Sequence, residues 1–431
     1  MTEPLKVALL ALNTPGYQSL ALGYLRSYAA ADGRLKGRVA FQTLDLTTDD
    51  EPWWVVFRLV ELGPDVVAIS AYCWSARSVF AICRILKAAL PHVRIVLGGP
   101  EVGPVAAHVL DRHPEVEAVV RGEGEAAFAD VVDRARRGKP FTHVDGVTAR
   151  DSAGTAVAAP DRPLIRELDD IPSPYLTGVL EPREGVAYIE TFRGCPHHCA
   201  YCFEGKGYTH IRSFGRERVE AEIAFLAEEK GVRSFTFVDS VFNLTADRLA
   251  WLTSTLARYA KRGVRLHTVE VDIERIDAAA AAALVRAGVV SVETGPQSTG
   301  ADALGLCRRR FDPARFSAGV AALKRASITV ECDLIAGLPG DTAETFLDGL
   351  EFCLTLDPGK VQISTLHLLP GTEFYDRAAE YGLVCDPEPP HEIISTATIG
   401  FPDLRRLEAR SVYVTRCYSA RSFQVRSEHV G

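Results

Sequence analysis

The chain has 431 residues, of which 47% are hydrophobic, and a formal net charge of −8 with acidic and basic residues mixed along its length. This length predicts two or three packed domains, and the charge pattern argues against a nucleic-acid-binding surface. No apolar run is long enough to cross a bilayer, and ten cysteines in so long a chain do not form a disulfide scaffold, so we expect a cytoplasmic protein that does not bind membranes.

Residues 1–145 alternate short apolar runs with helical patterns. The first run, at 6–12, is too short for a signal peptide and lacks a cleavage pattern, so we interpret it as a buried strand. Strands that alternate with helices predict an α/β fold with a doubly wound, Rossmann-like parallel sheet, whose ligand lies beyond the carboxyl ends of the strands. The expected strands are 6–12, 39–44, 66–71, 94–97 and 118–120, with helices that include 20–31 and 76–89.

Glycine-rich and polar turns follow several of these expected strands. Ser70 ends the third strand, Gly-Gly-Pro-Glu follows the fourth at 98–101, and Arg-Gly-Glu-Gly-Glu follows the fifth at 121–125. Glycine lets a backbone approach a bulky ligand closely. The two glycine motifs in this order resemble the cobalamin (B12)-binding-type domain of many radical S-adenosylmethionine (radical SAM) enzymes. The resemblance implies cobalamin contacts from Ser70, Gly98, Gly99, Glu101 and Glu123.

One motif of other B12 proteins, the Asp-x-His-x-x-Gly that supplies a histidine to cobalt, is absent from this chain. The first loop has Asn13 and Tyr17 but no histidine. We therefore expect that bound cobalamin has no protein histidine below its cobalt, and that other histidines of this domain lie at the surface: His92, His108 and His113. Several aromatic residues could pack either on a corrin ring or at a domain interface: Trp53, Trp54, Tyr72 and Trp74.

A linker at 146–185, rich in proline and charge, leads to the most informative motif of the chain. Cys195, Cys199 and Cys202 have the spacing C-x3-C-x2-C. Three thiolates on one loop can bind three irons of a 4Fe–4S cluster and leave the fourth iron open to a small molecule. A structural zinc site would need four ligands, usually from two cysteine pairs. No second such pair is present, and His197 and His198 are cramped between the cysteines, so zinc is the weaker alternative.

The cysteine loop, with the aromatic Tyr201 just before its third cysteine, resembles the signature of the radical SAM enzymes. This resemblance implies that the open iron binds the amino and carboxylate groups of SAM. It also implies that an electron from the cluster cleaves SAM to methionine and a 5′-deoxyadenosyl radical. A reductant such as flavodoxin or ferredoxin would then be a partner.

Residues 186–370 repeat the strand–helix pattern and predict a partial (β/α)6, TIM-like barrel. Function in such barrels lies at the carboxyl ends of the strands, where the cysteine loop follows the first strand. A tail at 371–431 is expected to cap the open side and to contribute to a substrate pocket. The expected strands are 187–192, 234–238, 266–271, 289–293, 329–335 and 360–366, and the expected helices are 217–229, 247–261, 278–287, 313–326 and 343–355.

Polar residues at the other strand ends complete the predicted site. By the resemblance, Asp239 and Ser240 contact the SAM amino group, and Glu293 and Gln297 contact its ribose and carboxylate. The fifth strand, with Asp333 and Gly337, resembles the one that flanks adenine. Each carboxylate could instead cap a helix or form a salt bridge.

These features predict a radical SAM enzyme that methylates an unactivated carbon of a small-molecule or peptide natural product with cobalamin. The alternative is a B12-independent dehydratase, epimerase or rearrangement enzyme that retains a vestigial B12-type domain. Such an enzyme would need a lone cysteine or tyrosine at a strand end to return a hydrogen atom; Cys332 lies in the fifth strand, but we expect Asp333 to take the inward position. A cobalamin or redox sensor would leave the open iron unexplained.

Overall fold

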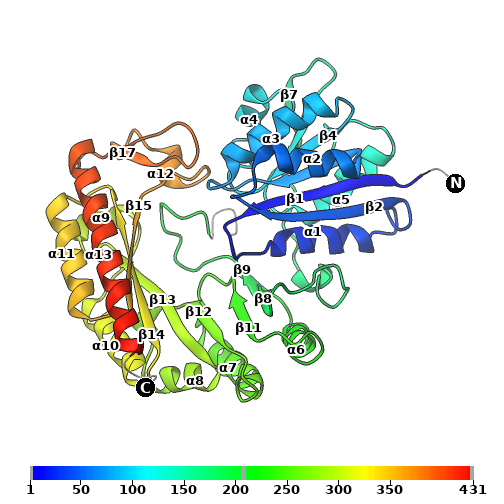
Figure 1. The fold of residues 1–431 in the computed structure, drawn as a ribbon. Helices are drawn as coiled ribbons and strands as arrows, with labels where there is room; N and C mark the ends of the chain where they lie inside the picture. The colour runs from blue at the N-terminus through cyan, green and yellow to red at the C-terminus, as the bar shows by residue number, and fades with distance from the viewer. Residues whose placement is uncertain (1–2, 205–209, 428–431) are drawn as a thin grey trace. The chain divides into compact units, whose positions relative to one another are not determined.

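The computed structural model describes residues 3–204 and 210–427, with side chains given as far as residue 417. The chain divides into two compact units (Figure 1). The first contains Met1–Glu181, Leu369–Gly371 and Glu388–Pro390, and the second contains Pro182–Leu368, Thr372–Pro387 and His391–Gly431. Residues 205–209 of the predicted barrel and 428–431 of the predicted tail lie outside the described residues. The predicted domain boundaries stay predictions.

The first unit is built on a seven-stranded sheet with the order β2-β1-β3-β4-β5-β6-β7. The first five strands are parallel, which confirms the predicted doubly wound sheet, and β6 and β7 add antiparallel pairs. This order places a topological switch point, where such sheets bind ligands, between β1 and β3. The bounds are β1 Leu5–Asn13, β2 Val39–Thr47, β3 Val66–Ser70, β4 Arg94–Gly98, β5 Ala118–Val120, β6 Val147–Arg150 and β7 Ala156–Ala158.

Helices cover both faces of this sheet and form two hydrophobic cores. The alternation of side chains along β1 shows why: Leu10 and Leu12 lie in the core with α2, α3 and α4, whereas Leu9 lies in the core with α1 and α5. A strand buried on both faces is therefore apolar throughout. The bounds are α1 Leu20–Ala31, α2 Pro52–Leu62, α3 Ala76–Ala89, α4 Ala106–Arg112, α5 Glu125–Arg136 and η1 Leu168–Asp170.

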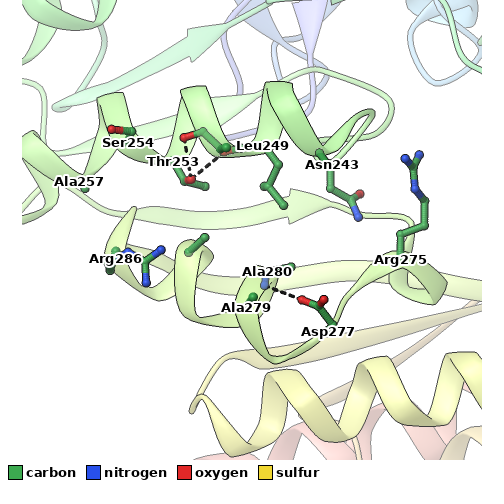
Figure 2. A pocket seen from close by; sticks show the side chains of 13 residues that line it. Asn243, Leu249, Thr253, Ser254, Ala257, Arg275, Asp277, Ala279, Ala280 and Arg286 are labelled. Atoms are coloured by element: carbon green, nitrogen blue, oxygen red, sulfur yellow. Dashed lines mark hydrogen bonds between the residues drawn. The ribbon is translucent and has the colours of Figure 1, made fainter.

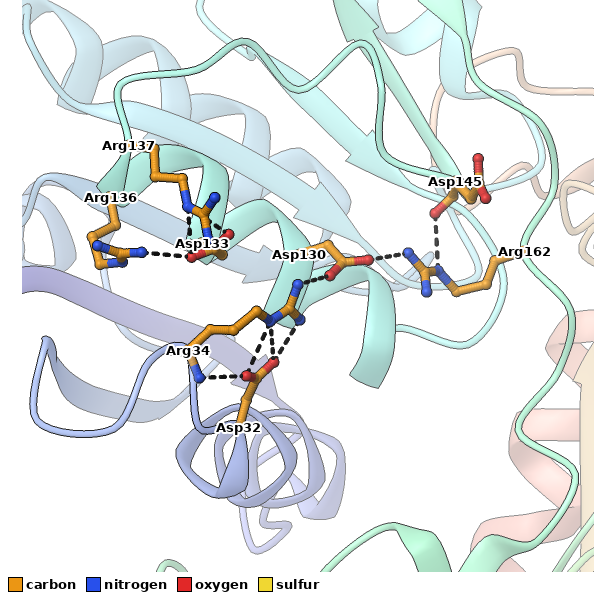
Figure 3. A network of polar contacts seen from close by, with 8 residues as sticks. All are labelled: Asp32, Arg34, Asp130, Asp133, Arg136, Arg137, Asp145 and Arg162. Carbon is orange, nitrogen blue, oxygen red and sulfur yellow. Dashed lines mark hydrogen bonds and ion pairs between the residues drawn. The ribbon is translucent and has the colours of Figure 1, made fainter.

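A network of ion pairs joins the end of α1, α5 and the segment after β7 (Figure 3). Arg34 bonds Asp32, and its Nη1 lies 2.8 Å from Oδ1 of Asp130 on α5. Arg162 pairs with the same carboxylate and donates to the carbonyl of Asp145 at 3.1 Å. Part of the segment predicted as a linker is therefore fastened to the first unit, and β6 and β7 within that segment belong to its sheet.

The second unit contains the six predicted strands in two parallel ladders. β8 pairs with β11, and β12, β13, β14 and β15 pair in chain order; one parallel bridge between Ser234 and Arg265 joins the ladders. This is the strand order of the predicted partial barrel. The bounds are β8 Val186–Ile189, β11 Ser234–Phe237, β12 Leu266–Glu270, β13 Val289–Gln297, β14 Thr329–Ala336 and β15 Lys360–Thr365.

Helices connect these strands, and several of them begin at side-chain caps that the sequence supplies. Asp312 caps α10, whose first residue is Pro313, and Thr342 forms a reciprocal capping box with Thr345 at the start of α11. The bounds are α6 Arg216–Ala224, η2 Phe225–Glu229, α7 Ala246–Ala260, η3 Ile273–Arg275, α8 Ala278–Arg286, α9 Ala301–Leu306, α10 Pro313–Arg325 and α11 Ala343–Thr355. Short strands flank the cysteine loop, β9 Phe192–Arg193 and β10 Arg212–Ser213.

The tail extends the sheet edge and packs beside β15. Ile393 donates its N–H to the Leu366 carbonyl at 2.9 Å, and the Thr415 hydroxyl lies 3.3 Å from the Val361 carbonyl. Its elements are α12 Glu373–Asp376, β16 Val384–Cys385, β17 Ile393–Ser395 and α13 Phe401–Ser427. A role in the substrate pocket stays a prediction. Within the described chain, no helix combines the length and apolar character that a membrane span requires.

Candidate functional site

The three predicted cluster ligands lie on one loop beyond β8 and β9: Cys195, Cys199 and Cys202. Burial raises the pKa of the Cys195 thiol and raises that of Cys202 to about 12. In the part of the chain that the structure describes, no three Cys, His, Asp or Glu side chains are grouped to hold a single metal ion. Ligands of a four-iron cluster bind separate irons and stand farther apart than the ligands of one zinc. Three thiols on one loop are a donor set that suits such a cluster.

Hydrogen bonds attach this loop to elements that are distant in sequence. The N–H of Ala200 donates to the carbonyl of Cys307 at 3.0 Å, and the carbonyl of Ala200 accepts from the N–H of Phe374 at 3.2 Å. Ser240, at the end of β11, donates its hydroxyl to the Gly194 carbonyl at 2.9 Å. Ser240 therefore supports the cysteine loop, and its predicted contact with SAM stays a prediction.

Asp239, also predicted to contact SAM, is buried and anchors the chain just before the cysteine loop. Its carboxylate accepts the N–H of Thr191 at 2.7 Å and the Thr191 hydroxyl at 2.5 Å, and it pairs with Nη2 of Arg248 at 2.5 Å. The guanidinium of Arg248 also covers the ring of Phe192, 4.9 Å from its centroid. Burial raises the pKa of Asp239, and Arg248 and Thr191 offset part of that rise. No sequence motif points to Thr191 or Arg248.

Three carboxylates interact on the facing strands β12, β13 and β14. Glu270 and Glu293 are register partners, and the Asp333 carboxyl is close enough to Glu293 for the two charges to repel each other. Burial and repulsion from Glu293 raise the pKa of Asp333 to about 9. Partial desolvation and repulsion from Glu293 raise the pKa of Glu270 to about 7, although its side chain is still exposed to solvent. At neutral pH this group of acids therefore holds at least one neutral carboxyl.

A bulge in β13 follows Glu293 and lets Gly295 approach Asp333 on β14 closely. Between Thr294 and Gln297 the pairing with β14 shifts register. A Cβ on Gly295 would lie 2.3 Å from the Asp333 carbonyl oxygen, so only glycine allows this approach. Gln297 takes a φ of 65° at the end of the bulge. One buried oxygen of Asp333, Oδ1, has no hydrogen-bond partner among the described residues, so a ligand N–H or O–H would satisfy it.

Tyr201 lies in the cysteine loop and Gly337 directly follows β14, and their contacts with cofactors stay predictions. The phenol of Tyr201 lies 3.4 Å from Nη1 of Arg309, and burial raises its pKa. Gly337 follows β14 with a φ of 88°, and a Cβ there would lie 2.9 Å from Ile393 of the tail. The structure therefore explains this glycine by packing. Cys332 is fully buried, and Asp333 beside it is partly exposed, so the inward position expected for Asp333 stays a prediction.

A separate cavity of about 560 Å³ lies between α7 and α8 (Figure 2). Small side chains such as Ala250 and Ala280 line it, and Arg275 and Arg286 also contribute to its walls. None of the predicted site residues lines this cavity. It lies in the helix layer and is separate from the cysteine loop.

In the first unit, most of the predicted cobalamin residues meet at the carboxyl ends of β3 and β4. Ser70 and Gly98 are register partners, and Glu101 is buried in the turn that follows. The Ser70 hydroxyl is buried beside the switch point without a hydrogen-bond partner among the described residues. This orphaned hydroxyl fits a polar group of a ligand. Glu123 lies apart, where its carboxylate accepts the N–H of Ile165 at 3.0 Å.

Gly99 and the nearby aromatic residues shape the same edge. Gly99 has a φ of 109°, and a Cβ there would lie 2.5 Å from the Ala71 carbonyl oxygen. Glycine is therefore required by the approach of two backbone segments of the protein itself. Tyr72 and Trp74 stack with ring centroids 4.6 Å apart, and Trp74 is 53% exposed. Their open face suits a flat ring. Trp53 and Trp54 are exposed on α2.

No histidine occurs in the loops that follow the five parallel strands of this sheet, at 14–19, 48–51, 71–75, 99–105 and 121–124. His92 and His113 precede β4 and β5, at the opposite edge, and the ring of His113 stacks on Phe80 with centroids 3.9 Å apart. That no protein histidine lies below cobalt stays a prediction. The positions of these histidines, away from the ligand-binding edge of the sheet, support it.

Two families are recognised in this chain. Residues 189–353 match the Radical SAM superfamily, and residues 19–132 match the B12 binding domain. The chain therefore contains a Radical SAM domain and, N-terminal to it, a B12 binding domain. These two domains imply a 4Fe–4S cluster and SAM in the second unit and cobalamin in the first.

Relatives of this radical SAM chain include two methyltransferases. It is 29% identical over 417 residues to the cobalamin-dependent radical SAM methyltransferase TokK of Streptomyces tokunonensis. It is 28% identical over 407 residues to 2-(S-pantetheinyl)-carbapenam-3-carboxylate methyltransferase of Streptantibioticus cattleyicolor. Each comparison covers 89% of this chain but only 58% of the relative, so the chain spans less than two thirds of their length. The structure of the radical SAM methyltransferase TsrM from Kitasatospora setae has the same fold, with a TM-score of 0.72 at 20% identity over 90% of this chain and 78% of that one.

The raised pKa of Asp333 in the radical SAM domain predicts a pH dependence of stability. Its pKa is about 9 in the folded protein but about 4 in an unfolded chain. The stability it contributes is therefore fully present below about pH 4 and is lost as the pH rises through about 9. From about pH 6 to 9, we expect the melting temperature of the cofactor-free wild type to fall by about 2–4 °C more than that of Asp333→Asn. Thermal melts at each pH measure this difference; parallel curves would contradict it, and the exposed Asp302→Asn is the control.

Proposed function

We propose that this protein methylates an unactivated carbon of a small-molecule or peptide natural product, using a 4Fe–4S cluster, SAM and cobalamin. One observation carries the proposal: a single chain joins the loop of Cys195, Cys199 and Cys202 to a B12-binding domain. In that domain the Ser70 hydroxyl is buried at the switch point and has no hydrogen-bond partner among the residues that the structure describes. The names of the two methyltransferase relatives support methyl transfer over the B12-independent alternative.

The residues of the second unit have separate parts in this proposal. The three cysteines would hold three irons, and Glu293, Gln297 and Asp333 would receive SAM beside them. Oδ1 of Asp333, which lacks a hydrogen-bond partner within the described part of the chain, would accept a hydrogen bond from a nucleoside N–H or O–H. When bound, the cluster and SAM would supply a deoxyadenosyl radical and the corrinoid a methyl group. The network of Asp239, Thr191 and Arg248 would keep the cysteine loop in place.

The residues of the first unit would hold the corrinoid. Ser70, Gly98, Gly99 and Glu101 border the predicted site, and the exposed stack of Tyr72 and Trp74 offers an aromatic surface. Glu123 would act through the segment after β7, whose backbone it binds. A low-potential flavodoxin or ferredoxin would deliver electrons. The ten cysteines, all free thiols, favour a reducing cytoplasm as the working compartment.

Cofactor uptake and SAM cleavage test this proposal together. We expect anaerobically reconstituted protein to retain hydroxocobalamin after gel filtration, as seen in its ultraviolet–visible spectrum, and to form 5′-deoxyadenosine from SAM when it is reduced. The electron paramagnetic resonance spectrum of the Co(II) form is expected to lack a histidine nitrogen coupling. Protein that takes up no corrinoid is not a cobalamin-dependent methylase; if such protein still cleaves SAM, the B12-independent alternative replaces it.

A further inference from the structure

An arginine that sequence reasoning did not identify contacts the cysteine loop directly. Arg309 lies between α9 and α10, and its Nη1 is 3.7 Å from Sγ of Cys199 and 3.4 Å from the Tyr201 hydroxyl. Its Nη2 donates to the Gly295 carbonyl at 2.6 Å, in the bulge of β13. Two residues earlier, the Cys307 carbonyl accepts the N–H of Ala200. The α9–α10 connection therefore holds the middle of the cysteine loop by both backbone and side chain.

The guanidinium of Arg309 is suited to act on an iron–sulfur ligand. It keeps its charge in proteins and presents several N–H groups in a rigid plane. One arm is fixed by the Gly295 carbonyl, so the other arm is aimed at Cys199 without a further loss of freedom. Hydrogen bonds to cluster sulfurs and nearby charge set the reduction potential of such clusters. The reduced cluster carries more negative charge, so a cation bonded to its sulfur ligand favours reduction.

We propose that Arg309 is a positioning residue that raises the reduction potential of a cluster held by Cys195, Cys199 and Cys202, through a hydrogen bond to the sulfur of Cys199. This inference rests on the proposed cluster. Arg309 also orients the Tyr201 phenol beside the same sulfur. If Arg309 only fastened the α9–α10 connection to β13, its hydrogen bond to the Gly295 carbonyl would be enough. The additional contact of its guanidinium with the Cys199 sulfur indicates a second role.

Of the two neighbouring arginines, Arg310 provides the matched control. Arg308 is exposed and pairs with Glu373 at 2.8 Å, and Arg310 is exposed. Removing the Arg310 charge at the surface changes the net charge as much as removing Arg309 does. Because exposed charges are screened by water and salt, Arg310→Met should change the equilibrium constant for cluster reduction by less than about twofold.

A redox titration followed by electron paramagnetic resonance tests the proposal on the reconstituted protein. We expect Arg309→Met to lower the equilibrium constant for cluster reduction about tenfold, which is about 59 mV toward more negative potential for one electron. Iron content close to that of the wild type, with an unchanged potential, would overturn the role of Arg309.

A second variant covers the case in which Arg309→Met does not assemble a cluster. In Arg309→Lys the single ammonium cannot bond the Gly295 carbonyl and reach Cys199 at once, so we expect a lower potential here too. A potential equal to that of the wild type contradicts the proposal. If the wild-type protein itself showed no 4Fe–4S signal, the proposed function would be refuted. Failure of the Arg309 proposal can therefore be told apart from failure of the proposed function.

Discussion

The triple variant Cys195→Ala, Cys199→Ala, Cys202→Ala is expected to lose nearly all iron and sulfide after anaerobic reconstitution. Iron–sulfur clusters are bound through cysteine thiolates, and these three provide every protein ligand that the spacing predicts. Among the described residues, no three Cys, His, Asp or Glu side chains are grouped to hold a single metal ion, so we expect no retention of iron at a mononuclear site. Iron and sulfide analysis per chain, with the visible absorption of the cluster, measures the loss.

A matched triple variant separates loss of the site from loss of thiols in general. Cys73, Cys385 and Cys417 lie far from the loop in sequence and are partly or fully exposed, so alanine at all three should disturb packing little. This control is expected to keep its full iron content. Near-full iron in the variant of the loop would rule out these cysteines as the cluster ligands.

The parts of the fold that the sequence predicted well are those fixed by local signals. Helices α1 and α11 have the predicted bounds because apolar periodicity coincides with caps, Ser19 for the first and Thr342 for the second. Helices were expected between the strands, but the sequence did not define the bounds of α2. Its exposed face carries the large apolar side chains of Trp53, Trp54 and Phe57, and no side chain caps its first turn, so it lacks both a polar face and a start signal. The strands β6 and β7 are short and form only by pairing at the sheet edge.

The helix α13 was missed for a related reason. It packs against β15, and the Thr415 hydroxyl reaches the Val361 carbonyl, so its stability depends on contacts far apart in sequence. Most helical stability in proteins comes from such packing. A pattern of residues along one segment does not show them.

The candidate site was predictable to the extent that its chemistry is local. Three cysteines on one loop are recognisable by spacing, and Glu293 and Asp333 are recognisable because they interrupt apolar strands. Their contact with each other depends on the register of β13 against β14 and on the bulge at Gly295. In the run Arg308-Arg309-Arg310, no sequence feature shows which side chain turns toward Cys199.

The buried pair of Asp239 and Arg248 is expected to have the largest effect on stability. Burial raises the pKa of Asp239 and lowers that of Arg248, so desolvation works against both charged forms. Such a pair adds little net stability compared with apolar residues, but removing one partner leaves a buried charge alone. We expect Arg248→Met to reduce the free energy of unfolding by about 3–5 kcal/mol. Urea titration of the cofactor-free protein measures this loss.

Two further variants identify the cause of that loss. Arg262 and Glu228 form an exposed pair in the same unit, 3.1 Å apart, and Arg262→Met is expected to cost less than about 1 kcal/mol. The double variant Arg248→Met, Asp239→Asn removes the lone charge and should recover part of the lost stability. Because Asp239 holds Thr191 just before the cysteine loop, Arg248→Met is also expected to incorporate less iron. A loss equal to that of Arg262→Met would show that the buried pair does not hold this part of the fold.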